Sequence, residues 1–347
     1  MTTATVRSVS RPWVWLAIAL QFLVLLGMAG EREWIVQTGE RLWLRTAPVD
    51  PRDPFRGDFV RLSYEVSRLG PRQLGFDPQQ RVLPEGAQVF AALERGPREV
   101  ARLRQVMETP PESGPFLRGR VQRGWYPWNG LEVKYGIEQL FVEQGRGQEI
   151  EARQGERQGV QVPLEVELAL NGRGTAVITG HRWSPLGIGL RTLRRDGEAE
   201  QSAPAPAPGA QEPIPLFELT LQNVSAAPLA LVLLPEECSF ALESVAWSPQ
   251  ALAPVRSECD GLAPAAGQIL TLAPGDSWQR RFDFTESRWQ VVLDDKTLPI
   301  DRLPWEQRFR LIYRPPAAER VAQPPGAAQV WHGELPSRAF HGRGQID

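Results

Sequence analysis

The sequence predicts a mainly β protein with one membrane-spanning helix at its start, followed by a β-rich domain and a β-sandwich. Three observations indicate this architecture. Residues 13–30 carry no charged side chain, and the remaining chain contains many short apolar runs separated by turn residues. The 32 prolines favour short strands joined by loops, because proline breaks helices and central strands. A chain of 347 residues is long enough for two domains with real cores.

The first element is a transmembrane helix, expected over residues 12–38 with a short extension beyond the lipid. As a helix, Trp13–Gly30 would span about 27 Å, close to the hydrocarbon thickness of a bilayer. Pro12 suits the first turn of a helix, where its missing N–H has no cost, and Gly39 suits its end.

The charges beside this helix predict its orientation. Arg7 and Arg11 precede it, whereas Arg32 after it lies between two glutamates. The positively charged flank of a transmembrane helix usually stays on the cytoplasmic side. We therefore expect the N-terminus in the cytoplasm and the bulk of the chain on the extracytoplasmic side. The alternative is a cleaved signal peptide, with Gly27 and Ala29 before the cut.

The β-rich domain is expected over residues 39–196. Phe59–Val66 alternates between apolar and polar side chains, which indicates one strand with a wet face. Asn171–Gly174 between two apolar runs predicts a hairpin turn. Ile137–Glu143 could form a short helix, as could Gln148–Arg153. Further strands are expected at 41–46, 88–93, 99–106, 116–123, 131–135, 162–170 and 175–183.

The chain changes character at residues 197–215, a Pro/Ala-rich stretch that we expect to be an extended linker between the domains. Residues 216–341 then show short alternating runs with regular turns, the pattern of an immunoglobulin-like β-sandwich. Strands are expected at 216–224, 229–234, 239–245, 268–272, 279–284, 307–313 and 329–334.

Cys238 and Cys259 are the only cysteines of the chain. We expect a disulfide between them if this part lies in an oxidising compartment. The alternative is two unpaired cysteines in a core.

A charged loop follows the first expected strand. It contains five charged residues around a rigid pair of prolines: Asp50, Arg52, Asp53, Arg56 and Asp58. Paired carboxylates can divide acid and base roles, and arginines can recognise anions. The alternative is a structured turn in which Gly57 supplies an unusual φ and the arginines neutralise the acids.

Several functional classes have no support in the sequence. The net charge of −2 offers no basic excess for nucleic acid. No spacing of His, Cys or carboxylate residues fits a metal site, and no glycine-rich loop fits a nucleotide or another cofactor. We therefore expect neither metal nor cofactor.

The run from Leu44 to Tyr64 resembles the GDYXXLXY family of bacterial membrane-anchored proteins. The motif falls on Gly57, Asp58, Phe59, Leu62 and Tyr64, with phenylalanine where the family has tyrosine. A second stretch, residues 132–147, is also similar to the family. The resemblance covers about residues 10–185. It implies a helix in the bacterial inner (plasma) membrane and often a neighbouring multi-span partner, and it adds these residues to the candidate binding surface: Tyr64, Lys134, Tyr135 and Glu138.

Our first hypothesis is therefore a non-catalytic, membrane-anchored extracytoplasmic protein that binds or stabilises an integral membrane protein or another envelope partner. The alternative is an envelope hydrolase that acts on carbohydrate or peptide through Asp50, Asp53 or Asp58, beside Trp125 and Trp128. A third possibility is a sensor that binds a small ligand between its domains. The oligomeric state stays open.

Overall fold

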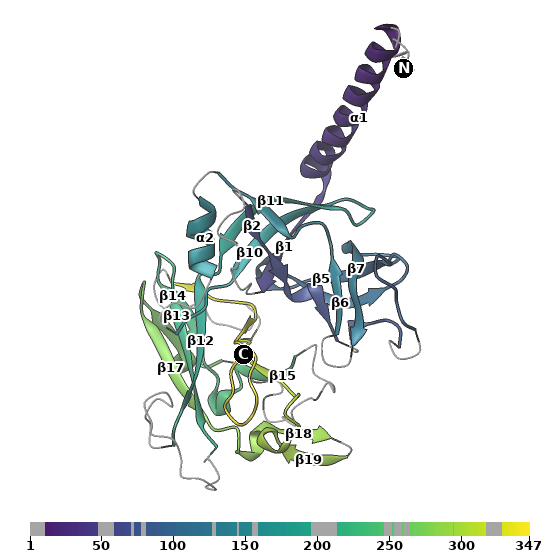
Figure 1. Cartoon of the computed structure of the whole chain (residues 1–347). Helices are drawn as coiled ribbons and strands as arrows, with labels where there is room; N and C mark the ends of the chain where they lie inside the picture. Colours follow the sequence, from purple (N-terminus) through teal and green to yellow (C-terminus); the bar gives the residue numbers. More distant parts are fainter. Residues whose placement is uncertain are drawn as a thin grey trace, which may run out of the picture.

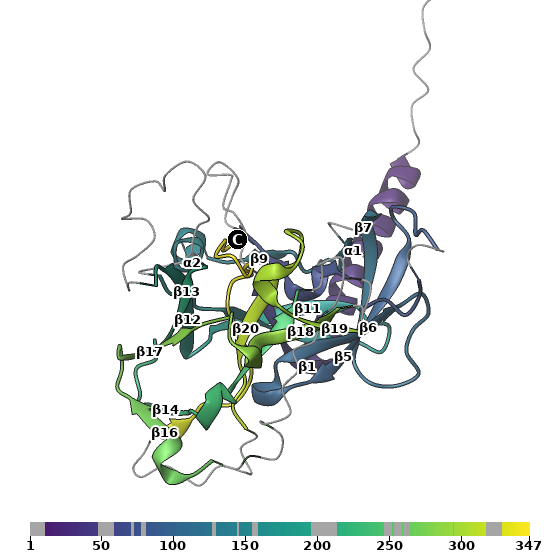
Figure 2. The same cartoon turned by 90° about the horizontal axis from the view of Figure 1, so that it is seen from below.

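The computed structural model shows a mainly β protein with one long N-terminal helix (Figure 1). It describes residues 11–47, 59–70, 73–77, 81–126, 130–143, 146–154, 159–195, 214–245, 252, 259, 262, 264–293, 295–316 and 328–347. Two separate hydrophobic cores organise these residues, one in each half of the chain. Figures 1 and 2 place β5, β6 and β7 on one side of the molecule and β12, β13 and β17 on the other.

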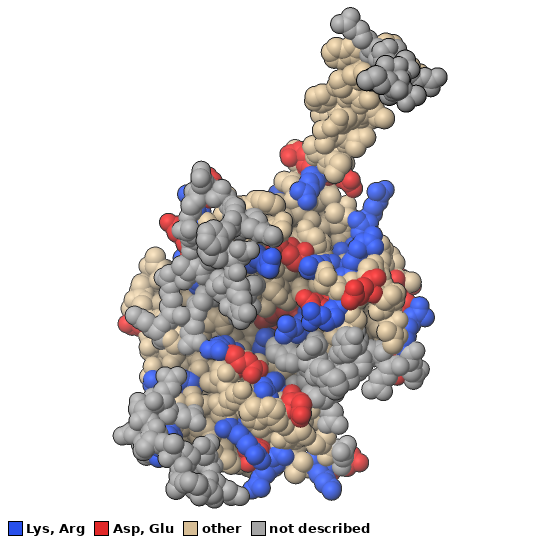
Figure 3. Space-filling model, in the orientation of Figure 1, with Lys and Arg blue, Asp and Glu red and all other residues tan. Residues whose placement is uncertain are grey.

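The helix α1 spans Arg11–Thr38 and projects away from the sheets (Figure 1). It is long and apolar enough to cross a membrane, and its most apolar window has no residue buried inside the protein. Figure 3 shows this apolar surface in tan, with charged side chains where the helix meets the first domain. These bounds agree with the sequence prediction.

A single residue, Gly39, separates α1 from strand β1. The Gly39 N–H donates to the carbonyl of Ile35 at 2.8 Å, and a Cβ at Gly39 would lie 2.4 Å from that oxygen. Ile35 itself is buried at 2% exposure. Only glycine therefore fits at this joint between helix and sheet.

The first core lies between two sheets. One has the order β11-β10-β1-β3, and the other has the order β4-β8-β7-β5-β6. A short pair, β2 with β9, adjoins them. The strands are β1 Glu40–Ala47, β2 Phe59–Arg61, β3 Ser63–Tyr64, β4 Arg68–Leu69, β5 Gln88–Arg95, β6 Ala101–Met107, β7 Phe116–Tyr126, β8 Gly130–Lys134, β9 Gln139–Phe141, β10 Leu164–Leu170 and β11 Ala176–Trp183.

Two local predictions for this half were wrong, and the short helix predicted after them was confirmed. The strand expected over Phe59–Val66 is divided into β2, β3 and the 3-10 turn η1 (Glu65–Ser67), because the chain changes from pairing with β9 to pairing with β1. Ile137–Glu143 is not helical, since it supplies β9. The charged segment after it does form a helix, α2, over Arg146–Gln154.

The hairpin predicted at Asn171–Gly174 is confirmed, with β10 and β11 antiparallel on either side. The Asn171 side-chain oxygen accepts the N–H groups of Arg173 and Thr175 at 3.0 and 2.9 Å. Gly174 has a φ of +74°, which side chains with a Cβ resist.

The second core begins earlier than the sequence analysis placed it. Strand β12 (Leu186–Leu193) pairs along its whole length with β13 (Leu216–Asn223), and its residues Leu186, Ile188 and Leu190 belong to the second core. The expected linker, residues 197–215, therefore connects two paired strands of one sheet. The packing divides the chain between β11 and β12, so β12 belongs with the second half rather than with the first domain predicted over residues 39–196.

The second half contains several short sheets around an aromatic core. Their orders are β12-β13-β17, β16-β14-β21, β15-β20-β22 and β18-β19. Separate, mostly antiparallel sheets on a shared core are the arrangement expected of a β-sandwich, and its immunoglobulin type stays a prediction. The strands are β14 Leu229–Val232, β15 Phe240–Ser244, β16 Ile269–Leu272, β17 Ser277–Phe282, β18 Gln290–Leu293, β19 Lys296–Pro299, β20 Phe309–Tyr313, β21 Gln329–Val330 and β22 Leu335–Pro336.

Candidate functional site

The charged segment between β1 and β2, residues 48–58, is called the signature segment here because it contains the start of the family motif. Strands of the first core lie on both sides of it. Before it, Thr46 and Ala47 at the end of β1 pair with Tyr64 and Ser63 of β3. After it, β2 pairs with β9. The predicted turn residue Gly57 lies outside the described residues, as do the predicted binding residues between these strands: Asp50, Arg52, Asp53, Arg56 and Asp58. The alternative assignment of the three aspartates as hydrolytic residues therefore stays a prediction.

Tyr64 and Tyr135, two candidate binding residues, form a reciprocal brace. The Tyr64 hydroxyl donates to the carbonyl of Ile137 at 2.6 Å, and the Tyr135 hydroxyl donates to the carbonyl of Val66 at 2.7 Å. Each tyrosine thus reaches the chain segment that carries the other. Their rings are buried at 1% and 7% exposure, so both hydroxyls are committed to the backbone inside the protein.

Glu138 holds the turn between β8 and β9. Its carboxylate accepts the backbone N–H groups of Tyr135 and Gly136 at 2.6 and 3.0 Å. Its own carbonyl accepts the N–H of Leu62 at 2.8 Å, which joins the turn to the family motif at Leu62. Gly136 has a φ of +80°, as a tight turn of this kind requires.

Burial makes Tyr64 and Tyr135 unsuitable as general acids or bases. It raises the pKa of both Tyr64 and Tyr135 well above the ordinary value, and the Glu138 carboxylate raises them further. Gly119 on β7 makes room for the Tyr135 ring, since a Cβ there would lie 2.8 Å from a ring carbon. The geometry therefore assigns the pair a structural role. Of the four described candidates, only Lys134 points into solvent at the end of β8.

The contact between the two halves was missed by sequence reasoning. Arg102 of β6 forms an ion pair with Glu334 at 2.9 Å, and Arg310 of β20 approaches Glu65 to 3.5 Å. Burial raises the pKa of Glu334 above its ordinary value, although Arg314 and Arg102 oppose the shift. No sequence pattern could reveal these pairs, because Arg310 and Glu65 are separated by 245 positions.

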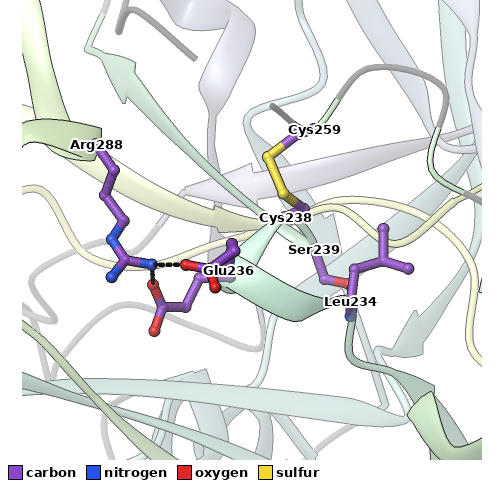
Figure 4. The surroundings of a disulfide bond; sticks show 7 residues. Leu234, Glu236, Cys238, Ser239, Cys259 and Arg288 are labelled. Carbon is purple, nitrogen blue, oxygen red and sulfur yellow. Dashed lines mark hydrogen bonds and ion pairs between the residues drawn. A yellow bond between two sulfur atoms is a disulfide. The ribbon is translucent and has the colours of Figure 1, made fainter. Parts of the chain in front are cut away.

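Cys238 and Cys259 form a disulfide in the second half (Figure 4). The two residues before Cys238 are strained, since Glu236 and Glu237 have φ angles of 51° and 54°. Arg288 holds both carboxylates at 2.8 and 2.9 Å. The disulfide and these ion pairs together fix a turn that neither glutamate would adopt by preference.

Among the described residues, no group of three or more His, Cys, Asp or Glu side chains is placed to hold a metal ion.

The comparisons with known proteins agree with the fold of the first half. The model of the GDYXXLXY protein family matches residues 21–180, which extend from the middle of α1 into β11. No curated protein and no solved structure matches the chain.

Proposed function

Residues 21–180 of this chain belong to the GDYXXLXY protein family, and from this we propose that the protein is a single-pass membrane tether without catalytic activity. Its two β-domains would lie on the extracytoplasmic side of a bacterial inner membrane. There they would bind or stabilise an integral membrane protein or another envelope partner.

The joint between α1 and β1 is the observation that carries this proposal. The helix reaches the sheet through Gly39 alone, and the Arg41 side chain donates to the carbonyl of Val36 in the last helical turn at 3.1 Å. The same guanidinium pairs with Glu167 of β10 at 2.9 Å. A spanning helix connected in this way would hold the first domain at the membrane surface.

The disulfide supports the extracytoplasmic placement, because disulfides persist in oxidising compartments and are rare in the cytosol. The charge bias around the apolar run of the helix supports the same orientation, with Arg7 and Arg11 before that run.

The proposed contact surface consists of the charged signature residues Arg52, Asp53, Arg56 and Asp58, together with the exposed Lys134 of the same half. Strand pairs with β3 and β9 hold the two ends of this segment, so a partner bound there would be fixed relative to the first core. The C-terminal half, which we expect to be immunoglobulin-like, would extend the contact.

Affinity copurification of the tagged full-length protein from a mild detergent tests the proposal. We expect an integral membrane protein to be recovered with it. Reversing the charges with Arg52→Glu and Arg56→Glu should reduce that recovery at least tenfold, on the order of the loss expected for charge-assisted contacts.

Arg173→Glu is the matched control, because Arg173 is exposed at the tip of the β10–β11 hairpin, far along the chain from the signature. It should leave recovery unchanged. Recovery of the bait alone, or equal loss with the control, would contradict the proposal.

A further inference from the structure

One face of the first sheet carries a row of charged side chains across three neighbouring strands. Arg45 of β1 lies opposite Glu165 of β10, and Glu165 lies opposite Arg182 of β11. Glu165 is fully buried at 0% exposure, and Arg45 is buried at 9%. Charges in such a row are expensive to bury unless each is paired.

A third guanidinium reaches the same carboxylate from outside the sheet. Arg98, in the 3-10 turn η3 (Pro97–Glu99), donates to both Glu165 oxygens at 3.3 and 3.2 Å. The Arg182 Nε donates to Glu165 at 2.8 Å, and its terminal nitrogen donates to the Arg98 carbonyl at 2.8 Å. The Arg182 guanidinium also stacks on Trp43, 3.9 Å from the ring centre.

Arg45 makes weaker contacts with Glu165 than Arg98 and Arg182 do. Its nearest approach to the carboxylate is an ion pair at 3.7 Å, beyond hydrogen-bond distance. Among the described residues, its buried Nε has no hydrogen-bond partner. Buried polar groups in proteins are almost always paired, so an orphaned guanidinium nitrogen indicates a missing acceptor.

The net charge of this cluster also indicates a missing anion. Among the described residues, three guanidinium groups and one carboxylate leave an excess of two positive charges. Burial lowers the pKa of Arg98, and the neighbouring Arg182 and Arg45 lower it further against the effect of Glu165.

The backbone is also strained here. Arg98 and Glu99 have φ angles of 57° and 60°, a region that residues with a Cβ seldom adopt. Strain of this kind concentrates at ligand sites.

We propose that Arg45, Arg98 and Arg182, beside Glu165, form a binding site for the phosphate group of inorganic phosphate or of a small phosphate monoester. Such a group carries close to two negative charges at neutral pH and offers three acceptor oxygens. It would balance the excess charge, whereas a monocarboxylate would leave one positive charge unmatched. Arginine forks suit phosphate oxygens.

Access would come from the side of Arg182 and Arg98, whose side chains are 32% and 20% exposed. This edge adjoins the second half, because a Cβ at Gly333 would lie 3.9 Å from the Arg98 Cδ. The row lies six residues along β1 from Gly39, or roughly 20 Å at the rise of a strand, and β1 leads away from α1 (Figure 1). A soluble phosphate therefore fits better than a lipid headgroup of the spanned bilayer.

Thermal unfolding and calorimetric titration of the full-length protein in detergent test this site. Inorganic phosphate and glycerol phosphate are each added against sodium chloride at constant ionic strength, with acetate as the monoanion. We expect saturable stabilisation by phosphate and little by acetate. Stabilisation by both inorganic phosphate and glycerol phosphate indicates a site that is open enough to admit a phosphate monoester. Stabilisation by inorganic phosphate alone indicates a site that admits only the free ion. Equal stabilisation by chloride, phosphate and acetate would overturn the proposal.

Two kinds of variant separate an anion site from a merely structural ion cluster. Arg45→Gln, or Arg182→Gln if the first does not fold, should weaken phosphate binding at least about tenfold, the effect of one charge-assisted hydrogen bond. Arg173→Gln, at the exposed hairpin tip, is the control and should bind phosphate as the wild type does.

Glu165→Gln removes the one negative charge and should make phosphate binding tighter, while lowering the stability of the phosphate-free protein. Undiminished binding by both arginine variants, or weaker binding by Glu165→Gln, would overturn the assignment. The copurification above is independent of phosphate, so either proposal can fail alone.

Discussion

The two cores of this chain are built from different side chains. The buried residues of the first core are mostly leucine and valine, with Tyr64 and Tyr135 as its buried aromatics. The second core gathers aromatic residues from many short elements: Phe217, Phe240, Phe282, Phe284, Trp289, Phe309, Tyr313, Trp331 and Phe340.

Strand length contributes to the difference, although β3 and β4 in the first half have only 2 residues each and β12 and β13 in the second half have 8 each. In the first half, β5, β7 and β11 have 8, 11 and 8 residues, and their pairing supplies long ladders of hydrogen bonds. In the second half, β14 and β16 have 4 residues each, and β21 and β22 have 2. Short strands leave more of the stability to large rings and to the disulfide, because each ring buries much apolar surface.

The strongest way to break this comparison is to truncate a central ring. Trp289 is fully buried and packs edge-on against Phe282 and Phe284, with ring centres 5.8 and 5.3 Å away. We expect Trp289→Ala to destabilise the second half by about 3–5 kcal/mol. Differential scanning calorimetry should show one transition falling while the other stays.

Trp305→Ala is the control, since Trp305 is 56% exposed and should cost about 1 kcal/mol or less. Parallel loss of both transitions with Trp289→Ala would mean that the halves unfold as one unit.

Removal of the disulfide should have the next largest effect. Cys238 and Cys259 are 21 positions apart, and a loop of that size is stabilised by about 3 kcal/mol when closed. We expect the variant Cys238→Ser with Cys259→Ser to lower the denaturant midpoint of the second half alone. A reductant should have the same effect on the wild type and none on the variant, and a shift in the first half instead would contradict the comparison.

The tyrosine brace sharpens the comparison in the first half. Tyr64→Phe keeps the ring but leaves the Ile137 carbonyl without its donor, at an expected loss of about 1–2 kcal/mol. Denaturant unfolding of the first half measures it, and Tyr135→Phe should lose a similar amount. If Tyr64→Phe abolished partner recovery with no loss of stability, the hydroxyl would have a binding role rather than a structural one.

The smallest expected effect is a pH dependence confined to the second half. Burial lowers the pKa of His341 below its ordinary value, and the nearby Arg308 lowers it further. The unfolded chain therefore binds a proton more readily, and stability should fall as pH decreases below about 6.5 toward the folded pKa. Unfolding of His341→Gln should lose that slope between pH 7.5 and 5.5. A slope that persists in the variant would assign it to another group.

Much of the fold could be predicted from the sequence because local patterns determine it. The uncharged run gave α1, and the Asn171–Gly174 turn gave the β10–β11 hairpin. Strand β12 was missed, since Gly187 and Gly189 interrupt its apolar pattern. Its glycines are there for close approach, as a Cβ on Gly189 would lie against the carbonyl of Gly159.

The sites depend on partners far apart in the sequence, and these could not be predicted. Glu165 alternates with apolar neighbours and has the pattern of a solvent-facing residue, yet it is fully buried. Its partners Arg45 and Arg98 come from other parts of the chain. Tyr64 and Tyr135 were predicted as binding residues, and their reciprocal bonds to the backbone could be seen only in three dimensions.

Because Gly39 alone separates α1 from β1, a tilt of the helix would tilt the first domain with it. Spanning helices lean by about 20° on average, and the lean grows when the bilayer is thinner than the apolar run. A folded body of about 300 residues is about 50 Å across. Each ten degrees of lean would therefore sweep its distal edge by about 9 Å parallel to the membrane, so that lipid thickness would set how far the protein can reach sideways.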